Sequence, residues 1–186
     1  MRIITGKARG VRLLTLEGDA PRPTLERAKE ALFSMIQFDI EGREVLDLFS
    51  GSGQLALEAV SRGAARATLC DRSKQAVSVI NQNVQKTKLT EFCRVVCSDW
   101  EELLRRYEKR EKFDIVFLDP PYAERLIPKV LPKLISVLKP HATVVCESAE
   151  ADVFGKSGVA EQFEIVKQAK YGVAYVTILK LKGEEI

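Results

Sequence analysis

The chain has 186 residues, of which 46% are hydrophobic and 30% are charged, and its formal net charge is +3. This length suits one domain with a substantial core, and the composition is that of a globular protein. No apolar stretch approaches the roughly 20 residues of a membrane span, and the first residues lack the apolar core of a signal peptide. We therefore expect a single cytoplasmic domain over residues 1–186, with no membrane partner.

Cysteine and histidine usage argues against a metal centre. The chain has four cysteines, Cys70, Cys93, Cys97 and Cys146, in or beside apolar runs, and a single histidine, His141. Cys93 and Cys97 are four positions apart, which does not match the spacing of a zinc knuckle. We interpret the cysteines as buried thiols of a reducing compartment, and we expect the protein to be a monomer without a metal.

Positive charge gathers near the N-terminus. Residues 1–12 contain four basic side chains and no acidic one, and a fifth follows shortly after them: Arg2, Lys7, Arg9, Arg12 and Arg22. Two strand-like segments, 2–5 and 11–16, flank a glycine-bounded turn and predict a β-hairpin appendage over residues 1–20. Such a basic arm can bind phosphates of a nucleic acid, although a solubilising surface would have the same composition.

From residue 45 onward, strand-like and helix-like segments alternate. The sequence predicts strands at 45–49, 67–70, 92–97, 113–118 and 142–147, and helices at 53–62, 73–87, 100–109 and 124–138. A further helix, with Thr24 as its candidate N-cap, precedes them, and alternating residues at 162–170 and 173–181 predict a terminal antiparallel hairpin. The alternation predicts an α/β fold, in which helices cover both faces of a mostly parallel sheet.

A glycine loop lies at the first strand-to-helix turn, in the segment Asp47-Leu48-Phe49-Ser50-Gly51-Ser52-Gly53. Glycines at this turn let the backbone bend tightly and approach a bound nucleotide. Asp71 follows Gly51 by 20 positions, at the end of the second strand, where a carboxylate can accept hydrogen bonds from ribose hydroxyls. With Ala56, the spacing also permits a nicotinamide dinucleotide, so the loop alone leaves the cofactor open.

The next strand ends carry further polar residues. Asp99-Trp100 follows the third strand and can offer an acceptor to an adenine amine and an apolar wall beside the base. Asp99, and Asp71 or Ser73, could equally be N-caps of the helices that follow them. Acids at successive strand ends favour a shared ligand site over capping alone, because the carboxyl ends of parallel strands meet at one edge of the sheet.

The segment Asp119-Pro120-Pro121-Tyr122 follows the apolar strand at 113–118. Neither proline can donate to a β-ladder, so the chain must leave the sheet at Asp119. The turn then presents a carboxylate, a backbone carbonyl and an aromatic ring together. Acceptors beside a flat ring suit a planar group that carries an NH2, such as a nucleobase. The segment has no evident role in hydride transfer, which argues against the dinucleotide alternative.

Together these residues resemble the S-adenosylmethionine-dependent methyltransferases that have a Rossmann-like sheet. Asp119-Pro120-Pro121-Tyr122 is similar to the signature of the members that methylate exocyclic amines. More narrowly, the whole chain resembles the RsmD type of small-subunit rRNA guanine-N2 methyltransferases, through Arg2-Ile3-Ile4, Arg22-Pro23-Thr24, the glycine loop, Asp71-Arg72 and Ser98-Asp99. The resemblance implies a seven-stranded sheet, S-adenosylmethionine as the cofactor, and 16S rRNA or a small-subunit particle as the partner.

The resemblance also implies a role for each residue of the site. The cofactor-binding residues would be Asp47, Phe49, Ser50, Gly51, Ser52, Gly53, Asp71, Arg72, Ser73, Asp99 and Trp100, with Thr24 and Arg27 approaching from the preceding helix. The catalytic turn would consist of Asp119, Pro120, Pro121 and Tyr122. In this turn the Asp119 carboxylate and the Pro120 carbonyl would bind the guanine amine, and Tyr122 would stack on the base. The RNA-binding residues would be Arg2, Lys7, Arg9, Arg12 and Arg22.

Other functions remain open at this point. The same turn would serve methylation of adenine N6 in DNA or of a glutamine amide, because each of these presents a planar NH2. The chain has no obvious separate DNA-recognition domain, which favours RNA. The remaining alternatives are a dinucleotide oxidoreductase and an RNA-binding or assembly module without catalysis. The intact cofactor loop argues against the module.

Overall fold

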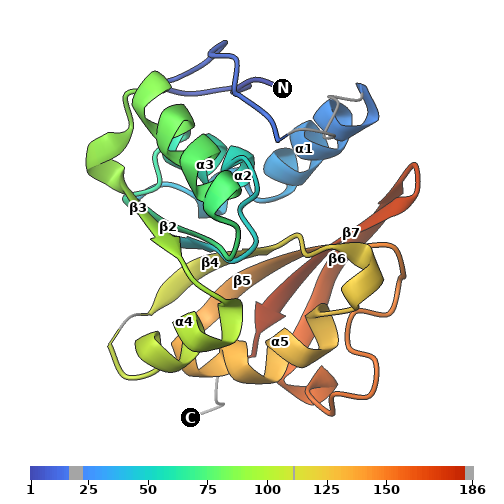
Figure 1. Ribbon diagram of the computed structural model, residues 1–186. Coiled ribbons are helices and arrows are strands. Elements are labelled where there is room, and N and C mark those ends of the chain that lie inside the picture. Colours follow the sequence, from blue (N-terminus) through green and yellow to red (C-terminus); the bar gives the residue numbers. More distant parts are fainter. Residues whose placement is uncertain (17–22, 111, 183–186) are drawn as a thin grey trace.

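A seven-stranded sheet forms the centre of the protein (Figure 1). The computed structural model describes residues 1–16, 23–110 and 112–182. The strands are β1 (Glu44–Asp47), β2 (Arg66–Asp71), β3 (Cys93–Cys97), β4 (Phe113–Leu118), β5 (Leu138–Ser148), β6 (Phe163–Tyr171) and β7 (Ala174–Leu181). Their order is β3-β2-β1-β4-β5-β7-β6, in which β1 to β5 run parallel and β7 is antiparallel to β5 and β6. The predicted sheet, mostly parallel with an antiparallel C-terminal hairpin, is confirmed.

Helices cover both faces of this sheet (Figure 1). The helices are α1 (Pro23–Met35), α2 (Gln54–Ser61), α3 (Lys74–Lys86), α4 (Trp100–Tyr107) and α5 (Ile127–Leu134). The first three lie on one face and the last two on the other, and each layer has its own buried apolar cluster. Strand β4 is apolar along nearly its whole length because helices cover it on both sides. None of the helices in the described residues is long and apolar enough to cross a membrane.

The carboxyl ends of the parallel strands meet at one edge of the sheet. Asp47, at the end of β1, pairs with Leu69 of β2 and Phe117 of β4, and Asp71, at the end of β2, pairs with Cys97 of β3. The strand order reverses at β1, because the chain moves outward to β3 and then returns to β4 on the other side of β1. Ligands of open α/β sheets bind in the crevice at such a reversal. The fold therefore brings the glycine loop and the turn after β4 together.

The N-terminal arm, defined here as residues 1–16, folds back on itself as the predicted hairpin, but its pairing is shorter than expected. An antiparallel bridge joins Arg2 and Arg12, the Ile3 amide donates to the Val11 carbonyl at 3.0 Å, and the Leu13 amide donates to the Met1 carbonyl at 3.0 Å. The pairing stops there because the next two amides, of Ile4 and Thr5, donate to the carboxylate of Glu58 in α2. Residues 17–20 of the expected appendage lie outside the described part of the chain.

The helix predicted at 124–138 is also shorter and less regular than expected. Two short 3-10 turns, Tyr122–Glu124 and Ile135–Val137, flank α5 on either side. Arg125 takes a left-handed conformation, with φ of 44°, and this ends the first turn before α5 begins. Strand β5 then starts directly after the second turn, ahead of the predicted position 142.

Candidate active site

Two glycines shape the loop after β1. Gly51 and Gly53 have positive φ angles, of 55° and 80°, which other residues rarely adopt. Gly53 is also packed tightly, because a Cβ atom there would lie 3.0 Å from the side chain of Leu69 in β2. The Ser50 amide donates to the Cys70 carbonyl at 2.9 Å, which ties the loop to β2. The loop is thus held close to the sheet where α2 begins.

Asp71 is fixed at the end of β2 by two backbone amides. Its Oδ2 accepts from the Gly51 amide at 3.0 Å, and its Oδ1 accepts from the Ser73 amide at 2.8 Å. A carboxylate oxygen can accept more than one hydrogen bond, so both remain able to accept from a ligand hydroxyl. The Ser73 hydroxyl instead caps α3, where it accepts from the Ala76 amide at 3.3 Å. Of the two candidate N-caps predicted for this helix, Asp71 and Ser73, it is therefore Ser73 that caps it.

Asp47 is the most buried acid at this edge, with 1% of its surface exposed. The Ala56 amide donates to its Oδ2 at 3.4 Å, whereas its Oδ1 has no hydrogen-bond partner among the described residues. Burial raises the pKa of the Asp47 carboxyl to about 7, and the neighbouring Asp71 carboxylate acts in the same direction. A buried acceptor without a partner is rare in native proteins, and here it indicates a place for a ligand that donates hydrogen bonds.

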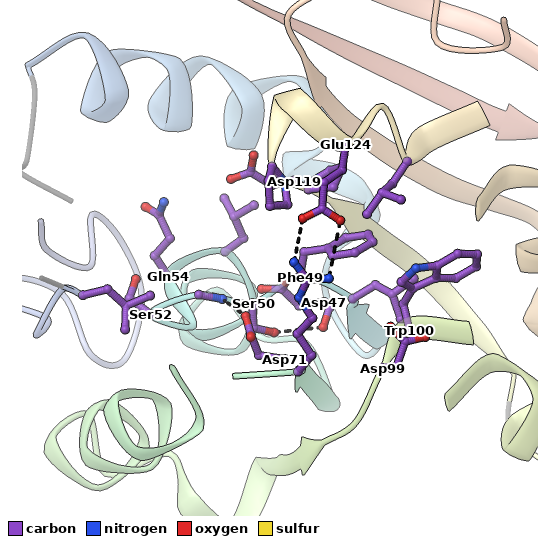
Figure 2. Close-up of a pocket in the computed structure, with 18 of the residues that line it drawn as sticks. Asp47, Phe49, Ser50, Ser52, Gln54, Asp71, Asp99, Trp100, Asp119 and Glu124 are labelled. Atoms are coloured by element: carbon purple, nitrogen blue, oxygen red, sulfur yellow. Dashed lines mark hydrogen bonds and ion pairs between the residues drawn. The ribbon is translucent and has the colours of Figure 1, made fainter. Parts of the chain in front are cut away.

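These residues line one cavity of about 490 Å³ at the carboxyl edge of the sheet (Figure 2). Thirteen of the residues assigned from the sequence line it: Asp47, Phe49, Ser50, Gly51, Ser52, Asp71, Arg72, Asp99, Trp100, Asp119, Pro120, Pro121 and Tyr122. Seven others that the sequence did not assign also line it: Leu16, Leu48, Gln54, Leu55, Ser98, Glu124 and Leu126. The structure thus brings the glycine loop, the strand-end acids and the turn at 119–122 around the same space.

Three other predicted cofactor-binding residues do not line the cavity. Gly53 caps α2, Ser73 caps α3, and Arg27 is exposed on α1. The side chain of Thr24 lies outside the described residues, as does Arg22, which was assigned to RNA binding.

The loop after β3 brings Asp99 and Trp100 to the cavity. Asp99 accepts from the Glu101 amide at 2.9 Å, so it caps α4 and lines the cavity at the same time. The indole of Trp100 is half-buried, and the ammonium of Lys133 lies 5.7 Å from its ring centroid. An acceptor next to a flat apolar ring can bind one edge and one face of a planar base.

The turn at 119–122 closes the cavity on the side of β4 (Figure 2). Pro120 is buried, whereas Tyr122 is 38% exposed. The Tyr122 hydroxyl donates to Glu147 Oε1 of β5 at 2.7 Å, which fixes the far end of the turn to the neighbouring strand. Partial burial, together with this hydrogen bond, raises the pKa of the Tyr122 hydroxyl above its usual value, so the group stays a neutral donor.

An ion pair joins two sides of the cavity. The guanidinium of Arg72, in the loop after β2, lies 2.6 Å from Glu124 Oε1, just beyond the turn at 119–122 (Figure 2). Both side chains line the cavity and are partly exposed, so the pair contributes little to stability. It connects loops that are 52 positions apart, and no local pattern in the sequence could have indicated it.

The N-terminal arm ends at the cavity, where Leu16 forms part of the wall. Asn83 of α3 holds the arm two residues earlier, because it accepts from the Leu14 amide at 2.8 Å and donates to the Leu14 carbonyl at 2.9 Å. The Asn83 amide also donates to the Ser52 carbonyl of the glycine loop at 2.9 Å. One buried side chain therefore connects the arm with the loop. The basic side chains of the arm are exposed: Arg2, Lys7, Arg9 and Arg12.

The polar groups around the cavity are mostly hydrogen-bond acceptors. Carboxylates of Asp47, Asp71, Asp99 and Asp119 line it from four strand ends (Figure 2). No group of three or more His, Cys, Asp or Glu in the described residues is placed to hold a metal ion. Separated carboxylates beside aromatic rings suit a ligand that carries hydroxyls, an amine and a planar ring.

Known proteins resemble this chain along most of its length. A family described as "Conserved hypothetical protein 95" matches residues 1–180. "Putative rRNA methyltransferase YlbH" of Bacillus subtilis is 35% identical over 187 residues, which cover 98% of this chain and 100% of that protein. "Ribosomal RNA small subunit methyltransferase D" of Haemophilus influenzae is 35% identical over 151 residues, which cover 80% of this chain and 78% of that protein. Among solved structures, "Putative methyltransferase yhhF from Escherichia coli" is 29% identical, covers 99% of each chain and has a TM-score of 0.85.

These matches agree with the fold and with the family resemblance of the motifs. The family profile spans nearly the whole chain, and both relatives by sequence carry names of rRNA methyltransferases. The chain therefore belongs to the RsmD family of methyltransferases, the family of the proteins named ribosomal RNA small subunit methyltransferase D.

Proposed function

We propose that the protein is an S-adenosylmethionine-dependent methyltransferase that methylates the exocyclic N2 amine of a guanine in small-subunit (16S) rRNA. The observation that carries this proposal is that the turn at 119–122 shares one cavity with the glycine loop and with the acids that end β2 and follow β3. Membership of the family supports the reaction class and an rRNA substrate. The choice of guanine N2 rests on the resemblance of the motifs to the RsmD type.

The residues of the cavity fit S-adenosylmethionine. The buried Asp47 Oδ1, which has no partner among the described residues, suits the ammonium of the methionine part. Asp71 would accept hydrogen bonds from the ribose hydroxyls, and Asp99 and Trp100 would bind the adenine. When bound, the cofactor supplies an electrophilic methyl group on a sulfonium sulfur.

The turn at 119–122 would activate the guanine amine through hydrogen-bond acceptors. The lone pair of that amine is delocalised into the ring, so the amine is a weak nucleophile. The Asp119 carboxylate and the Pro120 carbonyl would accept from the NH2 group and favour a lone pair localised on nitrogen. These hydrogen bonds strengthen as positive charge develops on the nitrogen, which is the condition for lowering the barrier. Tyr122, fixed by Glu147, would stack on the extruded base.

The variant Asp119→Ala tests this role. We expect methylation to fall by at least about 100-fold, because groups that stabilise developing charge contribute on the order of 10² to 10³ in kcat. The affinity for S-adenosylmethionine should stay close to that of the parent. Methylation is measured by nucleoside mass spectrometry after incubation with small-subunit particles and labelled cofactor, and affinity by calorimetry. Glu164→Gln, which removes an exposed carboxylate of β6, is the matched control and should behave as the parent.

The identity of the product separates the proposal from its alternatives. N2-methylguanosine in small-subunit RNA supports it, whereas N6-methyladenine or a methylated glutamine amide would assign the turn to another NH2 substrate. A protein that binds RNA but not S-adenosylmethionine would be a binding or assembly module. Calorimetric binding of NAD in place of S-adenosylmethionine would favour the oxidoreductase. Equal activity of Asp119→Ala and the parent would remove the turn from the mechanism.

A further inference from the structure

The turn at 119–122 also borders a second cavity, of about 180 Å³. Pro120, Pro121, Tyr122 and Leu126 line both this cavity and the larger one assigned to the cofactor. The opposite wall of the second cavity comes from the end of β5 and the loop that follows it, residues 147–153. The two cavities are therefore neighbours, and a base bound at the turn can contact groups of both.

Three carboxylates line the second cavity, and their partners differ. Asp152 accepts from two backbone amides of its own loop, and Glu150 forms an ion pair with Arg125 at 2.5 Å. Glu147 accepts from the Tyr122 hydroxyl through Oε1, and its Oε2 has no hydrogen-bond partner within the described residues. Glu147 is thus the carboxylate that is joined to the turn and retains an oxygen able to accept from a ligand.

The edges of the candidate substrates differ in what they present beside the reactive amine. Guanine has two adjacent donors, the N1–H and the N2 amine, whereas adenine has an acceptor, N1, beside its N6 amine. A glutamine side chain has a carbonyl beside its amide NH2. An ionised carboxylate only accepts hydrogen bonds. A carboxylate next to the turn therefore complements guanine and repels the acceptor that adenine or glutamine would place there.

We propose that Glu147 is a specificity-determining residue, which accepts a hydrogen bond from the N1–H of a target guanine bound at the turn that the two cavities share. The proposal rests on the proposed function, because it assumes an amine methylated at the turn. The Tyr122 hydroxyl holds the carboxylate through Oε1 and leaves Oε2 for the base. The same hydrogen bond orients the aromatic ring on which the base stacks, so one contact couples stacking with recognition of the Watson–Crick edge.

The test compares guanine with 2-aminopurine at the target position, once mass spectrometry of RNA fragments has located the methylated guanine. 2-Aminopurine keeps the amine at C2 but has no hydrogen on N1. We expect the parent to prefer guanine by about 10- to 100-fold in kcat/KM, the discrimination that one good set of base contacts supplies. In Glu147→Gln, the amide Nε2 can donate to an unprotonated N1, so the preference should narrow to about threefold or less.

The ratio of the two substrates isolates recognition of N1, because any difference in reactivity between the two amines is common to both enzymes and cancels. Glu164→Gln, exposed on β6 and outside both cavities, should keep the parental ratio. The fluorescence of 2-aminopurine, which rises when the base leaves the stack, gives a second readout on RNA binding alone. The fluorescence should rise more with Glu147→Gln than with the parent, because the amide of the variant can donate to N1 of 2-aminopurine.

The possible outcomes separate the role of Glu147 from the proposed function. An unchanged preference in Glu147→Gln would overturn the assignment of Glu147 and leave the proposed function standing. An equal loss of activity with both bases would overturn it as well, because Glu147 would then act only by holding Tyr122. A parent that methylates no guanine in the RNA would instead contradict the proposed function itself.

Discussion

Hydrogen bonds from backbone amides to side chains fix both the carboxyl edge of the sheet and the N-terminal arm, but the two regions are held in different ways. At the edge, acidic side chains bond to nearby backbone amides: Asp71 accepts from Gly51 and Ser73, and Asp99 accepts from Glu101. These contacts orient the carboxylates, and each carboxylate oxygen can still accept a further hydrogen bond. The edge therefore keeps hydrogen-bond acceptors that a ligand can use.

Buried side chains of α2 hold the arm and are themselves satisfied within the protein. Glu58 is 0% exposed, and it accepts from the amides of Ile4 and Thr5 at 2.8 Å and 3.0 Å. It also pairs with Lys29 at 3.2 Å and with Arg62 at 2.8 Å. Burial lowers the pKa of Lys29, and its contact with Glu58 opposes that shift. We infer that the arm is a fixed part of the fold and that the edge is adapted to a ligand.

Gly6 shows how closely the arm approaches α2. A Cβ atom at this position would lie 1.7 Å from the Ser61 carbonyl oxygen, and the φ angle of Gly6 is 86°. The same oxygen accepts from the Lys7 amide at 2.8 Å, and the Ser61 hydroxyl accepts from the Ala8 amide at 3.0 Å. The glycine is therefore required for docking onto the helix as well as for the turn.

The largest effect is expected from breaking the anchor of the arm with Glu58→Gln. The change leaves Lys29 and Arg62 without their shared counter-charge, and removing one partner of a buried ion pair costs about 3–5 kcal/mol. We expect the free energy of unfolding to fall by about this amount in urea denaturation, with little change in the m-value. The arm should also become sensitive to proteolysis before the rest of the chain unfolds.

The matched control is Glu102→Gln on α4. Glu102 forms an ion pair with Arg106 at 3.3 Å, with the same i,i+4 spacing as the pair of Glu58 and Arg62. Unlike Glu58, however, both Glu102 and Arg106 are exposed. Removing the charge of Glu102 should therefore lower the free energy of unfolding by about 0.5 kcal/mol or less. If the two variants lose similar stability, Glu58 does not anchor the arm.

The two regions also differ in how far the sequence predicts them. Strand-end residues such as Asp71 and Asp119 could be assigned because parallel strands bring their carboxyl ends together whatever the side chains do. The Glu58 contacts join residues 53 and 54 positions apart, and the contact of Asn83 with Leu14 joins residues 69 apart. Helical or strand periodicity within a segment of the sequence does not indicate contacts between residues so far apart. One signal was available, since Glu58 is the single charged residue in the apolar segment 55–60.

At the edge, the expected effect is intermediate and depends on pH. Because the pKa of Asp47 is raised to about 7, the carboxyl must lose a proton below that pH to bind an ammonium. We expect the Kd for S-adenosylmethionine to fall by up to about tenfold per pH unit as the pH rises from about 5 to 7. Above about pH 8 the α-amino group of the ligand loses its own proton, so the affinity should decline again.

Calorimetric titrations across this pH range, with the parent and with Asp47→Asn, measure the effect. The variant should bind more weakly and lose the acidic limb of the profile. The ligand-free parent should become less stable as the pH rises from about 4 to 7, since the native state then holds a proton that the unfolded chain has lost. Asp47→Asn should remove this slope too. A parental Kd that does not change between about pH 5 and 7 would exclude Asp47 as the ammonium ligand.

The smallest effect on stability is expected from the exposed charges of the arm. Neutralising Lys7, Arg9 and Arg12 together with glutamine should change the free energy of unfolding by less than about 1 kcal/mol, because exposed substitutions act weakly. The main loss would be the contact of the Lys7 ammonium with the Phe92 ring, whose centroid lies 4.9 Å away. This variant removes the positive charge of the arm but keeps the contacts that hold the arm on α2.

The same variant tests whether the arm binds RNA. Each phosphate contact that is lost lowers the slope of log affinity against log salt by about 0.7–0.9, so the triple variant should be shallower by about 2. Neutralising Lys156, Lys167 and Lys182, which are exposed in the C-terminal part, removes the same charge and should keep the parental slope. If the arm variant keeps the salt dependence of the parent while Glu58→Gln loses much stability, the arm has a structural role only. The RNA would then bind to another surface.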